Sequence, residues 1–244
     1  MARLDGVLQI SPQDLYTESS VQMGIPGALA STGDGRFFRY AKVGGTALVP
    51  GKLYQAPAET TGWENLACAA AVVGAKKIVT TSTITATANQ LAGGYVVITA
   101  STGAGYSYKI SSNTAASGAV CTITLEDPLL TAMDVSTSTI DIVANPYAEV
   151  VVSAGSGSGA TSTPLGVAVF AVTAEYYGWL QVAGPVGVLA DGGITVGALA
   201  VVSNSVAGAL EIATNGSTEA QPAIGVALTG ISTGEYGLIQ MQMA

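Results

Sequence analysis

Two stretches decide the fold: LGVAVFAVTAEYYGWLQVAGPVGVLADGGITVGALAVVS at residues 165–203 and AIGVALTGISTGEYGLIQMQM at residues 223–243. At an offset of 59 residues, LGVA in the first stretch matches IGVA in the second, and YGWLQV matches YGLIQM. Two matches at one offset indicate an internal repeat. Each copy is typical of a strand, a Gly/Thr turn and a second strand.

A third stretch carries a weaker version of the same pattern. Residues 44–54 (GGTALVPGKLY) echo residues 191–202 (DGGITVGALAVV), and the strand-like residues 36–43 precede the echo. The sequence therefore predicts an all-β protein in which residues 33–70 and 160–244 form one small β-barrel-like or β-sandwich-like domain. Residues 1–32 are then an extended N-terminal arm, in which Ser11-Pro12 is typical of the start of one helical turn.

Residues 71–159 have a different texture and are predicted to be an inserted second antiparallel β domain. Short segments in which apolar residues alternate with Thr, Ser or other small residues are separated by Gly, Asn and Ser, which is typical of half-buried antiparallel strands. The alternating segments lie at residues 80–87, 94–99, 106–110, 119–125 and 138–143. The run Gly155–Gly159 (GSGSG) is typical of a flexible turn or hinge after this domain.

Charge and composition exclude several classes of protein. The chain of 244 residues has 10% charged residues, 49% hydrophobic residues and a net charge of −8. Disordered chains have the opposite composition, and nucleic-acid-binding domains carry an excess of basic residues. A surface with so few charges favours a protein that is buried in an assembly.

No part of the sequence is typical of a membrane segment or a secretory signal. The longest strongly apolar runs, Ala67–Ala75 and Leu165–Val172, are too short to span a bilayer. No apolar segment follows the basic residue near the N-terminus, so we expect synthesis in a cytoplasm and no contact with membranes.

The sequence contains no recognisable catalytic, cofactor or metal site, and we expect no enzymatic activity. It has no histidine, which removes the commonest general base and metal ligand. Cys68 and Cys121 are expected to be small buried hydrophobic residues, with a disulfide between them as the alternative. A carboxylate enzyme that uses Glu126, Asp127 and Asp141 is the remaining catalytic hypothesis.

Six residues are candidates for contact with a partner. Arg36 and Arg39 lie in the most basic and aromatic stretch of the chain, and one of them could pair with an acidic partner. Tyr16 and Met23 lie in the arm, which could reach a neighbouring subunit. Tyr177 and Trp179 belong to the repeated YG block, and such aromatic residues either anchor interfaces or pack in a core.

The stretches 34–55, 165–203 and 223–243 resemble tailed-phage capsid decoration (cement) proteins. The resemblance covers about 110 residues, rests on pattern rather than on a catalytic motif, and does not include residues 71–150. It implies a structural virion protein, often trimeric, that binds the outer surface of the head and bridges subunits of the major capsid protein. The localisation implied is the capsid exterior. An alternative is a virion fibre or adhesin module that binds the host surface through residues 71–150.

Overall fold

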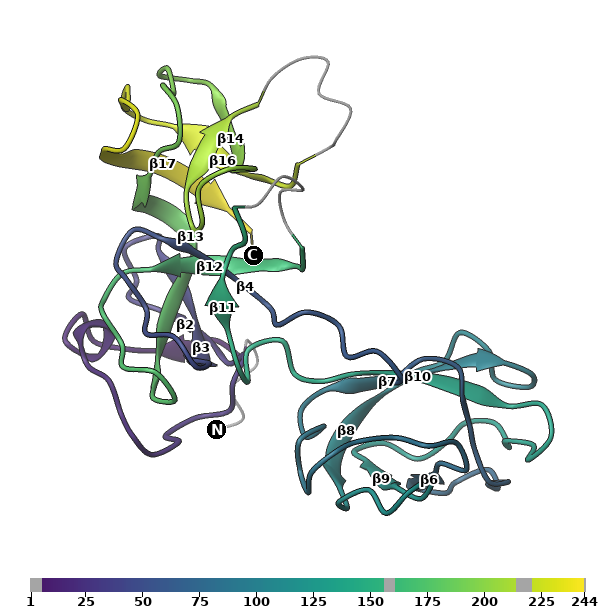
Figure 1. The fold of residues 1–244 in the computed structure, drawn as a ribbon. Helices are drawn as coiled ribbons and strands as arrows, with labels where there is room; N and C mark the ends of the chain where they lie inside the picture. Colours follow the sequence, from purple (N-terminus) through teal and green to yellow (C-terminus); the bar gives the residue numbers. More distant parts are fainter. Residues whose placement is uncertain (1–5, 156–160, 214–220, 244) are drawn as a thin grey trace. The chain divides into compact units, whose positions relative to one another are not determined.

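The computed structural model describes residues 6–155, 161–213 and 221–243 (Figure 1). The described residues form an all-β protein whose one helical element is a 3-10 turn, η1 (Asp14–Tyr16). Contacts divide the chain into two compact units. Unit 1 comprises Met1–Ala58 and Pro146–Ala244, and unit 2 is the intervening Glu59–Asn145.

The domain boundaries predicted at residues 70/71 and 159/160 are wrong. Residues 59–70 belong to unit 2, because Trp63 and Leu66 are buried in its core. Residues 146–155 belong to unit 1, where Val150 is buried and Val152 packs beside it. The hinge predicted at Gly155–Gly159 falls mainly on residues 156–160, which lie outside the described residues.

Unit 1 is built on one sheet of eleven strands, in which neighbours pair in the order β1-β2-β3-β13-β17-β16-β14-β15, while β4 joins β11 and β12 to this path. The strands are β1 (Leu8–Gln9), β2 (Leu29–Ser31), β3 (Phe37–Lys42), β4 (Leu53–Gln55), β11 (Val151–Val152), β12 (Pro164–Ala168), β13 (Tyr177–Leu189), β14 (Leu199–Val202), β15 (Leu210–Ile212), β16 (Ala223–Ala227) and β17 (Tyr236–Gln242).

The sheet closes into two small five-stranded barrels, which we call module A and module B. In module A the strands β3, β13, β12, β4 and β11 pair in sequence, and a parallel bridge between Val43 and Val150 closes the ring. In module B the strands β13, β17, β16, β14 and β15 pair in the same way, and a parallel bridge between Ala190 and Leu210 closes the ring. Each module has its own hydrophobic core.

The internal repeat read from the sequence is confirmed in the hydrogen bonds. The amide of Gly51 donates to the carbonyl of Ala168 in module A, and Gly197 donates to Ala227 in module B, both at 2.8 Å. The antiparallel bridge Leu48–Val172 has its counterpart in Ile194–Ile231. The echo between residues 44–54 and 191–202 therefore reflects a duplicated five-stranded module.

The repeated glycines mark places where strands approach closely. A Cβ atom on Gly166 would lie 2.7 Å from the carbonyl oxygen of Gln181, and one on Gly225 would collide with the equivalent carbonyl of Gln240. The glycines of the two YG blocks face the side chains of Val172 and Ile231, which also occupy equivalent positions. The repeated glycines thus allow neighbouring strands to approach closely, and they do not supply a chemical group.

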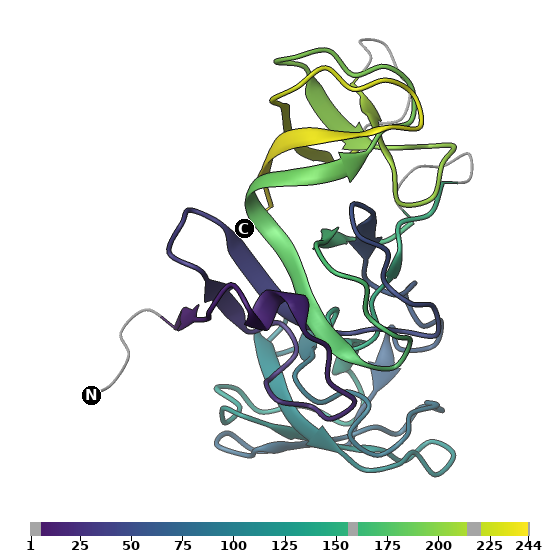
Figure 2. The ribbon, with the colours of Figure 1, turned by 90° about the vertical axis from the view of Figure 1, so that its left-hand side faces the viewer.

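Strand β13 belongs to both modules and bends between them. Figure 2 shows it as one long green strand that curves, with β17 in yellow beside its second half. At the bend, Gly184 has a left-handed φ of 91°, a conformation that favours glycine. The buried amide of Gln181 donates to the carbonyls of Ala183 and Pro185, at 3.0 and 2.9 Å, which fixes the curvature.

Residues 1–32 were predicted to be an extended arm, but the described part, residues 6–32, packs against unit 1. Its strand β1 pairs parallel with β2, and β2 pairs antiparallel with β3, so both belong to the sheet of unit 1. The predicted helical turn is confirmed: Ser11 and Asp14 exchange hydrogen bonds just before η1, and Leu15 within η1 is buried. The apolar side chains of the arm explain this, because an isolated arm would leave Leu15 in water.

Unit 2 is a six-stranded antiparallel sheet in the order β5-β10-β7-β8-β9-β6. Its strands are β5 (Leu66–Ala67), β6 (Lys77–Val79), β7 (Tyr95–Ala100), β8 (Ser107–Asn113), β9 (Thr122–Leu125) and β10 (Thr139–Val143). A bridge between Cys68 and Thr80 joins the two edge strands, so this sheet also closes on itself. Closure removes the exposed strand edges that would otherwise invite aggregation.

Most of the strands predicted for this region are present, but residues 81–87 do not form one. The strand lies earlier, at β6, and Thr80 turns its hydroxyl inward to donate to the carbonyl of Ala119. The following segment makes scattered contacts rather than a ladder: the indole of Trp63 donates to the carbonyl of Thr85, and the amide of Ala116 donates to the carbonyl of Ala86. Cys68 and Cys121 are free and buried in the core, which confirms the expected packing role and answers the open question of a disulfide.

Candidate partner-binding surface

Residues 17–28 cross the surface of unit 1 as a segment held near both ends, which we call the strap. Ser19 and Tyr177 exchange backbone hydrogen bonds of 3.1 and 2.9 Å. The carboxylate of Glu18 accepts hydrogen bonds from the amide and the hydroxyl of Thr173. At the other end, the amide of Gly27 donates to the carbonyl of Tyr40 at 2.7 Å. These contacts hold the strap against β3 and β13.

The middle of the strap presents apolar side chains to solvent. Val21, Met23 and Ile25 alternate along the chain and are 64%, 79% and 64% exposed. The backbone beneath them is fixed, because the amide of Met23 donates a hydrogen bond to the hydroxyl of Tyr40 at 3.0 Å. Exposed apolar side chains on a fixed backbone are suited to binding a partner at a low cost in conformational entropy.

A hollow of about 300 Å³ lies between the arm and the sheet. Met23 lines it together with Tyr40, Tyr177 and Trp179. The Tyr40 ring stacks on Tyr177 with centroids 5.8 Å apart and meets Trp179 edge-on at 5.1 Å. Three of the six predicted contact residues therefore lie together, and the two aromatic ones pack against Tyr40 as well as facing the hollow.

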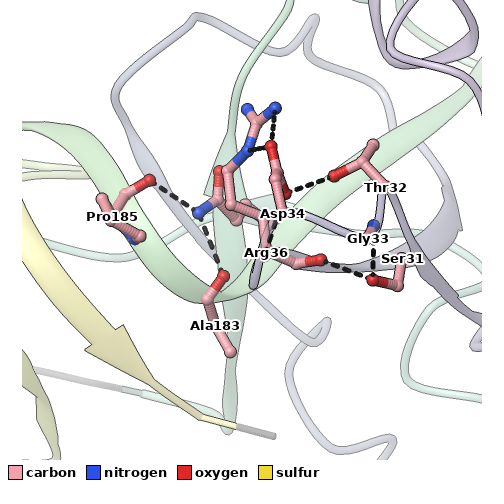
Figure 3. A network of polar contacts seen from close by, with 8 residues as sticks. Ser31, Thr32, Gly33, Asp34, Arg36, Ala183 and Pro185 are labelled. Carbon is pink, nitrogen blue, oxygen red and sulfur yellow. Dashed lines mark hydrogen bonds and ion pairs between the residues drawn. The ribbon is translucent and has the colours of Figure 1, made fainter.

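The two predicted arginines already have partners within the chain. Arg36 forms an ion pair with Asp34, at 2.8 Å, within a network that Figure 3 shows around the turn before β3. The hydrogen bond that the Arg36 side chain donates in this contact is the main cause that holds the pKa of Asp34 well below its usual range. Arg39 donates to the carbonyl of Gly27 at 2.8 Å and lies over the ring of Tyr147. Whether either arginine also contacts an acidic partner stays a prediction.

Tyr16 and Arg36 line a second hollow, of about 480 Å³, where modules A and B meet. Tyr236 and Leu238 of module B also line it. The Tyr236 ring lies against Gly51, where a Cβ atom would come within 2.5 Å of it. The predicted contact residues thus fall into two hollows of unit 1, with Arg39 outside both.

Two of the three carboxylates of the catalytic hypothesis, Glu126 and Asp141, each have a separate structural contact. Glu126 pairs with Lys109 at 3.0 Å, and Asp141 accepts a hydrogen bond of 2.6 Å from the amide of Asn65. Within residues 6–155, 161–213 and 221–243, three or more His, Cys, Asp or Glu side chains nowhere gather as a metal would require. In the same ranges, no helix has the length and apolar character needed to cross a membrane.

Val21, Ile25 and Tyr40 also belong to this surface, although they were not predicted to contact a partner. A signal for the first two was present, because Val21-Gln22-Met23-Gly24-Ile25 alternates apolar residues before the Pro26-Gly27 turn. However, no sheet partner was predicted for the arm. The alternation of its apolar residues therefore did not show which side of the arm would face water. Comparison with known proteins finds no matching family model, no similar curated protein and no similar solved structure.

Proposed function

We propose that the protein is a structural component of a virion, which binds the outer surface of a tailed-phage head and stabilises the capsid by bridging major capsid protein subunits. One observation carries the proposal: the strap offers Val21, Met23 and Ile25 to solvent on a fixed backbone. The resemblance of residues 34–55, 165–203 and 223–243 to decoration proteins supplies the class of partner.

The remaining properties of the chain are consistent with this role. A decoration protein needs rigid structure and extensive contact rather than chemistry, and many copies on one shell multiply a modest affinity. Three small barrels provide that rigidity. A net charge of −8 disfavours nonspecific adhesion to nucleic acid. Assembly as a homotrimer and residence on the capsid exterior are parts of the same proposal.

Co-sedimentation with assembled tailed-phage heads tests the proposal. The double variant Val21→Asp/Met23→Asp places two charges on the strap without touching a buried residue. We expect the wild-type protein to sediment with the heads and the variant to bind at least about tenfold more weakly. Absence of wild-type binding, or equal binding by the variant, would contradict the proposal.

A matched control also examines the alternative of a host-binding fibre or adhesin. Unit 2 exposes Val72 and Val73, which are 73% and 63% accessible, next to exposed Leu130. The variant Val72→Asp/Val73→Asp should keep full binding to heads. If it instead loses binding to host cells while the strap variant keeps it, the adhesin function is the correct one.

A further inference from the structure

We propose that the outer face of module B is the surface through which this chain associates with a second copy of itself. The face consists of Leu199 on β14, Val226 on β16, Leu238 and Gln240 on β17, and Leu228 just after β16. We call it the open face. The inference concerns self-association alone, and it locates a contact that the proposed homotrimer leaves unspecified.

The five residues lie on one side of the sheet by register. Leu199 is paired with Val226, and Val226 with Gln240, across neighbouring strands. Leu228 lies two residues after Val226, and Leu238 lies two residues before Gln240. The amide of Leu228 donates to the carbonyl of Leu238 at 2.9 Å. Side chains two apart on a strand share a face, so the four apolar groups form one continuous patch.

This patch is accessible in the single chain. Leu199, Val226, Leu228 and Leu238 are 44%, 42%, 46% and 45% exposed. The residues between them point inward and are buried in the core of module B, as Ala227 and Ile239 show. The open face is therefore the regular outer surface of a sheet, and its apolar character is not needed to fill its own barrel.

The equivalent face of module A shows what covers such a surface. Through the repeat, Leu199 corresponds to Leu53 and Val226 to Val167, and these two are paired across β4 and β12 as their counterparts are across β14 and β16. Leu53 and Val167 are fully buried, and they belong to the core of module B rather than to that of module A. Val169, the counterpart of Leu228, packs against the same core.

Within one chain, then, this type of face is covered by another copy of the same module. The backbone seals the contact, because the amide of Leu53 donates to Gly208 and that of Leu189 donates to Gly51, at 2.8 and 2.9 Å. Module B repeats the same pairing pattern and the same apolar positions, yet among residues 6–155, 161–213 and 221–243 no third module covers its face. A second copy of the chain supplies the missing module.

Charge supports a partner identical to the protein. Two chains of net charge −8 repel each other, so they can associate only where few charges meet. The open face carries no ionisable side chain. The sequence has no Lys or Arg after Lys109, so module B offers no cation for an acidic partner. A neutral apolar surface on an acidic protein is suited to contact with the same surface, or with an adjoining surface, of a second copy.

Light scattering on the purified full chain, without capsids, tests the inference. The variant Val226→Asp/Leu238→Asp places charges on the open face, and Val226→Thr/Leu238→Thr is a milder change that keeps strand-favouring residues. We expect a multimeric wild-type protein and, for both variants, half-dissociation at a concentration at least about tenfold higher. Circular dichroism reports whether each variant is folded, and the Thr variant decides the matter if the Asp variant is not.

The control is Val72→Asp/Val73→Asp, which adds the same two charges to unit 2 and should leave the mass unchanged. A monomeric wild-type protein, or a folded open-face variant with wild-type mass, would overturn the inference. Neither result depends on binding to heads, because the measurement is made without capsids. The strap residues are also unchanged in these variants. Failure of the intact wild-type multimer to bind heads would instead count against the proposed function.

Discussion

At the scale of single residues, the repeated glycines are tightly constrained positions of unit 1. Gly225 faces the carbonyl oxygen of Gln240, a backbone atom that cannot move without disturbing the β16–β17 ladder. We predict that Gly225→Ala lowers the free energy of unfolding by about 1–3 kcal/mol, since the added methyl overpacks the strand pair. Thermal or urea unfolding monitored by circular dichroism measures the change.

A matched control for this prediction lies in the same module. A Cβ atom on Gly230 would meet nothing within 4 Å. Gly230→Ala should therefore change stability by less than about 0.5 kcal/mol. Equal effects of the two substitutions would show that the cost of Gly225→Ala is not a matter of packing against Gln240.

Asp34 gives unit 1 a stability that depends on pH. Its carboxylate accepts hydrogen bonds from Thr32 and from the Arg36 side chain, which lower its pKa from the ordinary 3.8. A lowered pKa in the folded state stabilises the fold above pH 3.8 and loses that effect as pH falls through the folded pKa. We predict that Asp34→Asn lowers the melting temperature at pH 7 and that the difference shrinks on acidification. An equal difference in melting temperature at pH 7 and in acid would contradict this prediction.

At the scale of elements, sequence patterns located strands where apolar alternation coincided with turn residues. β3 was predicted in place from an aromatic and basic stretch between glycine turns, and β12, β16 and the first half of β13 were predicted from the repeated GVA and YG blocks. The segment 80–87 alternates equally well, but its polar groups bond across the end of the unit 2 sheet. Alternation specifies two unlike faces, and it does not specify that a neighbouring strand is available.

The candidate surface was less accessible to sequence reasoning than the strands were. Met23, Tyr177 and Trp179 were identified individually, but their meeting depends on the strap folding back over β13. The open face could have been found by aligning Leu199 with Leu53, yet only the structure shows that Leu53 is covered by the other module. Burial of a repeated position is a property of the assembled fold, not of the motif.

At the scale of the whole molecule, unit 2 is inserted where module B has only a short turn. The chain enters unit 2 after β4 and returns to unit 1 before β11. The strands β4 and β11 pair directly, with Val151 opposite Gln55. In module B the corresponding strands β14 and β15 are joined by residues 203–209. The insertion therefore begins and ends at adjacent points of the host barrel.

We predict that the two units fold independently. Replacing residues 59–145 by a short Gly/Ser linker should leave unit 1 folded, because the joined strands already lie side by side. Residues 59–145 alone should also fold, because their core is formed entirely by their own side chains. Cooperative thermal transitions of both fragments by circular dichroism would agree with this, and an unfolded fragment of either kind would refute it.

The strand β13 has a mechanical consequence for unit 1. Its first half completes one barrel and its second half completes the other. Losing the whole of β13 from one barrel would remove a wall of the other. We therefore expect the two cores to melt in one cooperative transition. We also expect a load applied to either end of unit 1 to be shared by both barrels.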